Sequence, residues 1–97
     1  MSEWVRVATF EGDENAARAI VDEINKEPGP PPGIPAKSIM VGFDQENNHV
    51  RVVTRFDSKE NLDTGSATLD EMSPPDDSGM RRISVEKLEI LLERQAP

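Results

Sequence analysis

The stretch that decides the fold is residues 37–56, KSIMVGFDQENNHVRVVTRF. Apolar residues alternate with polar or small ones in its two halves, Lys37–Phe43 and His49–Phe56, and the polar segment Asp44–Asn48 joins them. Alternation with a period of two, bounded by Asp, Glu and Asn, is typical of a half-buried β-hairpin.

The two faces of this hairpin differ in composition. One is strongly apolar and consists of Ile39, Val41, Phe43, Val50, Val52 and Phe56, and the other is mixed and consists of Ser38, Met40, Gly42, His49, Arg51, Val53 and Arg55. The apolar face is expected to carry the core. A mixed face fits a subunit interface or a partly wet cavity better than bulk solvent.

A strand and a helix are predicted before the hairpin. The strand Trp4–Phe10 has apolar residues on both faces, so both faces are expected to be covered. Asp13 is a suitable N-cap for a helix that runs from Glu14 to about Lys26. Its apolar stripe has helical spacing and consists of Ala17, Ile20, Val21 and Ile24.

A proline-rich segment, Pro28–Pro35, ends this helix. We interpret it as a stiff connector that carries the chain back across the sheet. The alternative is a polyproline II ligand for an SH3-type domain. The connector is favoured because regular elements flank a short segment.

A second helix follows the hairpin. Asp57 as N-cap and Glu60 three residues later resemble a capping box, and the helix runs to about Met72. Gly65 and Ser66 interrupt its apolar stripe with almost no side-chain volume. Such residues either allow the helix to approach a strand closely or leave a gap that a ligand can fill.

The last regular segment is predicted to be a strand, Arg81–Ile90. Its apolar phase changes between Val85 and Leu88, which indicates a β-bulge. A helix from Ser84 competes with this interpretation, because Glu, Lys and Leu favour helix. The strand is preferred because it completes the order of elements.

The predicted order is βαββαβ in a single domain, residues 1–97. This order predicts an α+β, ferredoxin-like fold, with a four-stranded antiparallel sheet and two helices on one face. The right-handed crossover rule places the first and third strands side by side at the centre of the sheet.

Composition excludes several classes of function. Lys and Arg number 11 against 19 Asp and Glu, and a net charge of −8 disfavours binding to nucleic acid or to anionic membranes. The chain has no cysteine, hence no disulfide or thiolate chemistry, and no apolar run long enough to cross a membrane. We see no secretory signal and expect a cytoplasmic protein without a metal or cofactor. Because only 35% of the residues are hydrophobic, part of the buried surface is expected to lie between subunits.

Five segments carry a resemblance to a known superfamily: Ala8–Asp13, Gly33–Lys37, Thr64–Leu69, Met72–Pro75 and Gly79–Val85. With the order of elements, they make the chain similar to the dimeric α+β barrel superfamily, which includes the antibiotic-biosynthesis-monooxygenase-like proteins, and most similar to its small actinobacterial members. The resemblance covers almost the whole chain. It implies a homodimer in which two sheets pack face to face.

The resemblance does not imply a mechanism. Cofactor-free monooxygenases of the superfamily use an Asn on the first strand and Trp residues near the cleft, and haem-degrading members use a His on the second helix. The first strand here has no Asn, and the second helix has neither His nor Trp. The favoured function is therefore a homodimer that binds a small molecule or a protein. The alternative is a cofactor-independent monooxygenase that acts on an aromatic or polyketide-like substrate.

Three residues of one strand face are polar site candidates. His49 is the only histidine and a weak candidate for a general base, although a structural role at the strand edge is favoured. No second ligand lies at metal spacing from it. Arg51 and Arg55 lie in line with His49 and are candidates for an anion-binding row. Pairing with the abundant Asp and Glu residues is the favoured alternative.

A small-molecule site, if present, is predicted between the sheet and the second helix. Its candidate lining residues come from the hairpin and from that helix: Phe43, Phe56, Leu62, Gly65, Leu69 and Met72.

Overall fold

The computed structural model describes residues 2–26, 28–29, 33–71 and 80–96. Within these residues the elements follow one another in the predicted order: β1 (Trp4–Glu11), α1 (Glu14–Ile24), β2 (Ser38–Asp44), β3 (His49–Phe56), α2 (Lys59–Glu71) and β4 (Arg81–Glu89). The boundaries differ from the predicted ones by at most two residues. The last segment is a strand, so the competing helix from Ser84 is excluded.

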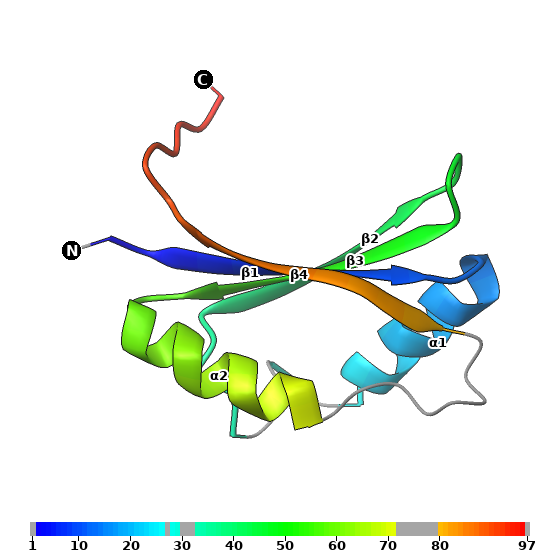
Figure 1. The fold of residues 1–97 in the computed structure, drawn as a ribbon, viewed down its shortest axis with the longest axis horizontal. Helices are drawn as coiled ribbons and strands as arrows, with labels where there is room; N and C mark the ends of the chain where they lie inside the picture. Colours follow the sequence, from blue (N-terminus) through cyan, green and yellow to red (C-terminus); the bar gives the residue numbers. More distant parts are fainter. Residues whose placement is uncertain (1, 27, 30–32, 72–79, 97) are drawn as a thin grey trace.

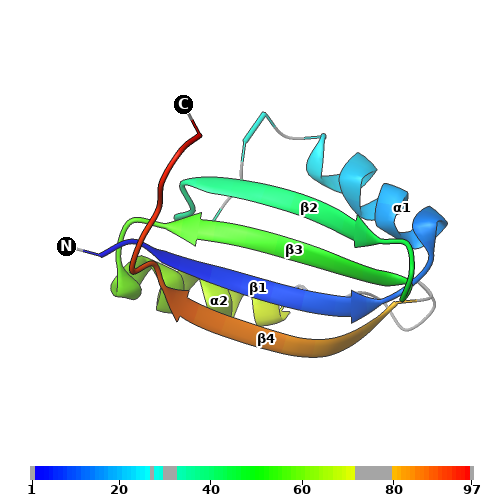
Figure 2. The ribbon, with the colours of Figure 1, turned by 90° about the horizontal axis from the view of Figure 1, so that it is seen from above.

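The four strands form one antiparallel sheet in the order β2-β3-β1-β4 (Figure 2). As predicted, β1 and β3 are the two central strands. Each of them is paired on both sides, whereas β2 and β4 are the edges of the sheet.

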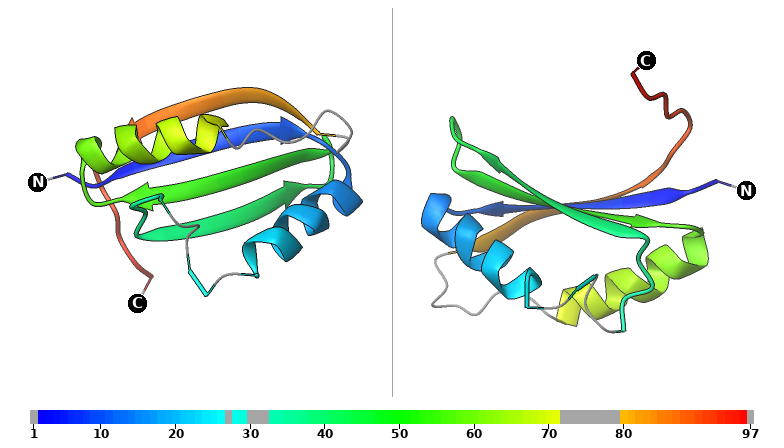
Figure 3. Two further views of the ribbon diagram at one scale, coloured as in Figure 1. Left: turned by 90° about the horizontal axis from the view of Figure 1, so that it is seen from below. Right: turned by 180° about the vertical axis from the view of Figure 1, so that it is seen from behind.

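Both helices lie on the same side of the sheet (Figures 1 and 3). Helix α2 packs against β1 and β3, and α1 packs against β2. We call the opposite side the helix-free face. We expected both faces of β1 to be covered, but among the described residues no helix or strand packs on the side that carries Val5 and Val7, and only the segment after β4 crosses over it.

The core beneath α2 combines residues from distant parts of the chain. Ile34, Phe56 and Leu62 are buried together, and Trp4, Ala36 and Leu69 pack around them. Ile34 belongs to the predicted connector, which therefore contributes a core side chain as it returns toward β2. Pro30, Pro31 and Pro32 lie outside the described residues, and the polyproline II alternative lies there with them.

Helix α2 approaches the sheet closely at Gly65. A Cβ atom built on Gly65 would lie 2.4 Å from Cε1 and 2.8 Å from Cζ of Phe56. Carbon atoms in van der Waals contact lie about 3.5–4.0 Å apart. The structure therefore has the close approach at this position and no gap.

The N-terminal caps agree with the prediction in one helix and differ in the other. In α1, Oδ1 of Asp13 accepts a hydrogen bond from the backbone N–H of Ala16 at 2.9 Å, as predicted. In α2, the cap is Ser58, whose Oγ accepts from the backbone N–H of Asn61 at 3.1 Å. The predicted capping box on Asp57 is wrong, because both residue types are suitable caps and the chain enters the helix one residue later.

The bulge in β4 lies at a different position from the predicted one. Thr9 pairs with Ser84 and Phe10 with Arg82, so Ile83 is the extra residue. Val85 and Leu88 lie beyond the bulge in regular pairing, opposite Ala8 and Val5. The change of apolar phase arises because β4 places Val85 on the helix side and Leu88 on the helix-free face.

Candidate functional site

The helix-free face carries a continuous apolar band. Met40, Val53 and Val7 lie directly opposite one another on β2, β3 and β1. Val5 and Leu88 extend the band across β1 and β4. Met40 is 63% exposed and Leu88 47%, whereas the three valines are half-buried.

The arginines that border this band on β3 have carboxylate partners. Nη1 of Arg51 lies 3.8 Å from Oδ2 of Asp44. Nε of Arg55 donates to Oε1 of Glu3 at 2.7 Å, and both of its Nη atoms reach the carboxylate of Glu93. The row predicted for an external anion is thus paired with acidic residues of the chain itself, which was the favoured alternative.

These ion pairs lower the pKa values of the carboxyl groups that take part in them. A hydrogen bond from Arg55 and a smaller contribution from Lys37 lower the pKa of Glu3. The guanidinium of Arg55 also lowers the pKa of Glu93. The two acids therefore remain ionised below the pH at which exposed glutamates become protonated.

His49 lies at the turn end of β3, opposite Asp44 on β2 and Glu11 on β1. Among the residues that the structure describes, no group of three His, Asp or Glu side chains could hold a metal ion. Asp44 beside it organises the turn, because it accepts hydrogen bonds from the side chain of Asn47 and from the backbone of Glu46. The first of these bonds is the largest cause of the lowered pKa of Asp44.

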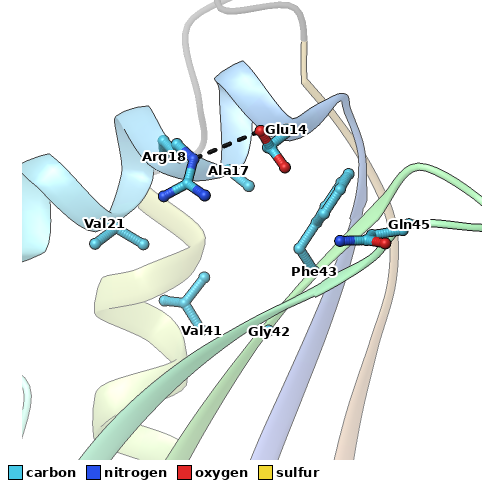
Figure 4. Close-up of a pocket in the computed structure, with 8 residues that line it drawn as sticks. All are labelled: Glu14, Ala17, Arg18, Val21, Val41, Gly42, Phe43 and Gln45. Atoms are coloured by element: carbon cyan, nitrogen blue, oxygen red, sulfur yellow. Dashed lines mark ion pairs between the residues drawn. The ribbon is translucent and has the colours of Figure 1, made fainter.

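A small cleft opens between α1 and the edge strand β2 (Figure 4). Its volume is about 200 Å³. The walls are apolar toward the sheet, and an ion pair of 3.7 Å between Arg18 and Glu14 lies at the helix rim. The lining residues are Glu14, Ala17, Arg18, Val21, Val41, Gly42, Phe43 and Gln45. Clefts that enclose drug-sized ligands usually measure about 300–1,000 Å³, so this one fits only a small group.

The structure separates the residues predicted to line one pocket. Phe43 lies in the α1–β2 cleft. Leu62 and Leu69 of α2 pack with Phe56 of β3 between the helix and the sheet. Gly65 lies against the ring of Phe56. Met72 lies outside the described residues.

A buried charge was missed by the sequence analysis. Arg6 on β1 is 3% exposed, and its Nε donates to Oγ of Ser66 at 3.1 Å. Its Nη2 donates to Oδ1 of Asp70 at 2.9 Å, and Nη1 of Arg82 donates to the same oxygen at 2.7 Å. The sequence did contain a signal for it. Arg6 alternates with Trp4 and Ala8 along the strand, so this charged residue falls on the core face of β1.

Burial and pairing act in opposite directions on this network. Burial lowers the pKa of Arg6, whereas the charge of Asp70 and the hydrogen bond to it raise it. For Asp70, burial raises the pKa, but the bonds from Arg82 and Arg6 outweigh that effect and leave the pKa below its ordinary value. Both groups are therefore charged at neutral pH, and the network fastens the last turn of α2 to β1 and β4.

Comparison of the sequence with protein-family models, with curated proteins and with solved structures finds no match. The superfamily resemblance therefore stays a prediction. No helix among the described residues is long and apolar enough to cross a membrane.

Proposed function

We propose that the chain is a homodimeric binding module whose two subunits pair through their helix-free faces. The observation that carries this proposal is the apolar band from Met40 to Leu88, which no helix or strand among the described residues covers. Monomeric proteins rarely leave a contiguous apolar patch of this kind across a whole sheet. The resemblance to the dimeric α+β barrel superfamily supports the same arrangement.

A second copy of the chain is the partner that this face fits best. A two-fold interface uses the same patch on both subunits, so the patch must complement itself. The band is apolar at its centre, and it has Arg51 beside it on β3 and Glu86 on β4. Charges of both signs at the rim allow two copies to pair without like-charge repulsion.

A small-ligand site and the alternative monooxygenase function have less support than the dimer. The α1–β2 cleft is the proposed place for a small ligand, and in a face-to-face dimer it stays on the outer surface of each subunit. The cofactor-independent monooxygenase remains the alternative function, but no described contact of His49 supports a role in proton transfer.

Replacing Val53 with aspartate should dissociate the dimer. The change would bury a carboxylate at the centre of the apolar band, which is strongly unfavourable without a partner. We expect wild-type protein to have about twice the 10.7 kDa chain mass in size-exclusion chromatography with light scattering at micromolar concentration, and Val53→Asp to have the chain mass.

Val21→Asp is the matched control. Val21 is 38% exposed on α1, on the helix side of the sheet, and the same substitution there should leave the dimer intact. A wild-type protein that is monomeric at micromolar concentration would contradict the proposal. So would equal effects of the two substitutions.

A further inference from the structure

The residues that follow β4 form an extended arm above the helix-free face. The arm comprises residues 90–96, and Figures 1 and 2 show that it rises from the end of β4 and crosses over the β1 and β3 ends of the sheet. It starts with a backbone contact to the residue just before β1, in which the backbone N–H of Ile90 donates to the carbonyl oxygen of Glu3 at 2.9 Å.

An ion pair fixes the direction of this arm. The guanidinium of Arg55 holds the carboxylate of Glu93 in a bidentate contact, with Nη2 at 2.8 Å from Oε1. Arg55 lies on the helix-free side of β3, opposite Val5. The contact therefore holds the arm over that face. Bidentate Arg–carboxylate pairs are geometrically specific, so the arm has a preferred orientation before any partner arrives.

The arm carries two apolar side chains that do not pack on their own subunit. Leu91 is 87% exposed and Leu92 is 74% exposed, which exceeds the exposure of Met40 and Leu88 in the sheet. Any protein domain that covers the helix-free face must therefore contact this arm, because the arm projects above that face.

We propose that the arm is part of the dimer interface and that Leu91 and Leu92 pack against the second copy of the chain. This inference rests on the proposed function, because it assumes that the occupant of the helix-free face is a second copy. In the two-fold dimer each subunit gives one arm and receives one. The exposed Met40 on edge strand β2 is an apolar surface on which the partner's leucines can pack.

The test compares two double variants of the arm across a dilution series, with the dimer dissociation constant measured by sedimentation velocity. Leu91→Ser with Leu92→Ser should raise the dissociation constant at least tenfold, since moving even one leucine from water into an apolar contact changes an equilibrium constant by about that factor. Arg94→Ser with Gln95→Ser changes the same arm without removing apolar surface and should leave it within about twofold. Circular dichroism should show an unchanged fold, because both leucines are exposed in the subunit.

Trypsin gives a second measurement on the unmodified protein. Cleavage after Arg94, followed by mass spectrometry, should slow several-fold when the protein concentration rises from well below to well above the dissociation constant. An unchanged dissociation constant in the leucine variant, or cleavage that does not depend on concentration, would overturn this inference and leave the dimer in place. A wild-type chain that is monomeric at all concentrations would instead overturn the proposed function and this inference with it.

Discussion

Replacing Gly65 with alanine should lower the free energy of unfolding by about 2 kcal/mol, although alanine is the better helix former by about 1 kcal/mol. The added methyl group would lie 2.4 Å from Cε1 of Phe56. Phe56 is fully buried between Ile34 and Leu62, so its ring cannot move aside without disturbing the core. Urea denaturation at fixed protein concentration, followed by circular dichroism, measures the change.

Gly29→Ala is the control for the loss of backbone freedom. A Cβ atom on Gly29 would meet nothing within 4 Å, so this variant should be as stable as wild type or slightly more stable. If Gly65→Ala were also neutral, the close approach of α2 to β3 would be contradicted. The larger Gly65→Leu would then be tolerated as well, as expected for a pocket wall.

Removing Asp70 should cost about 2 kcal/mol of stability at neutral pH. Asp70→Ala leaves the guanidinium of Arg6, which is 3% exposed, without its carboxylate partner. Breaking a fully buried ion pair typically costs about 3–5 kcal/mol, and the effect is smaller here because the side chain of Asp70 is 49% exposed. Thermal and urea unfolding of the two proteins measure the difference.

Asp63→Ala is the matched control on the same helix. Asp63 lies 3.9 Å from Lys59, and both side chains are more than half exposed. Such surface pairs contribute at most about 1 kcal/mol, and both substitutions change helix propensity equally. Equal losses in the two variants would show that Arg6 does not depend on Asp70.

The effect of Asp70 should depend on pH in a defined direction. Because the folded-state pKa of Asp70 is lowered, its charge stabilises the fold fully above the unfolded-state value, near 3.9. That stability is lost as the pH falls through the lower folded-state value. The difference between wild type and Asp70→Ala should therefore be constant from neutral pH to about pH 5 and should shrink below about pH 4.

Local patterns in the sequence were sufficient for the order of the elements. The period of two in residues 37–56, the helical stripe from Ala17 to Ile24 and the crossover rule together predicted the sheet order. The finer errors have local causes. Asp57 and Ser58 are both suitable caps, and only the path of the chain selects Ser58. The bulge at Ile83 depends on its pairing with Thr9 and Phe10, which are more than seventy residues away in the sequence.

The candidate site was harder to predict because it depends on distant partners. Arg55 is paired by Glu3 and Glu93, which lie near opposite ends of the chain. Likewise, Asp70 meets Arg6 only after α2 has packed on β1. Gly65 marked an unusual position in the sequence. Whether that position is a close contact or a gap depends on Phe56, which lies next to it only in the folded chain.

The central claim, that two chains pair through their helix-free faces, is tested most directly by distances between spin labels. The chain has no cysteine, so Ser84→Cys on the helix-free side of β4 and Thr64→Cys on α2 each introduce one label per subunit. Face-to-face sheets lie about 10 Å apart with the helices outside, so double electron–electron resonance should give about 25 Å or less for labels at Ser84 and more than about 35 Å at Thr64. Shorter distances at Thr64 than at Ser84, or no intermolecular distance at either position, would contradict the account.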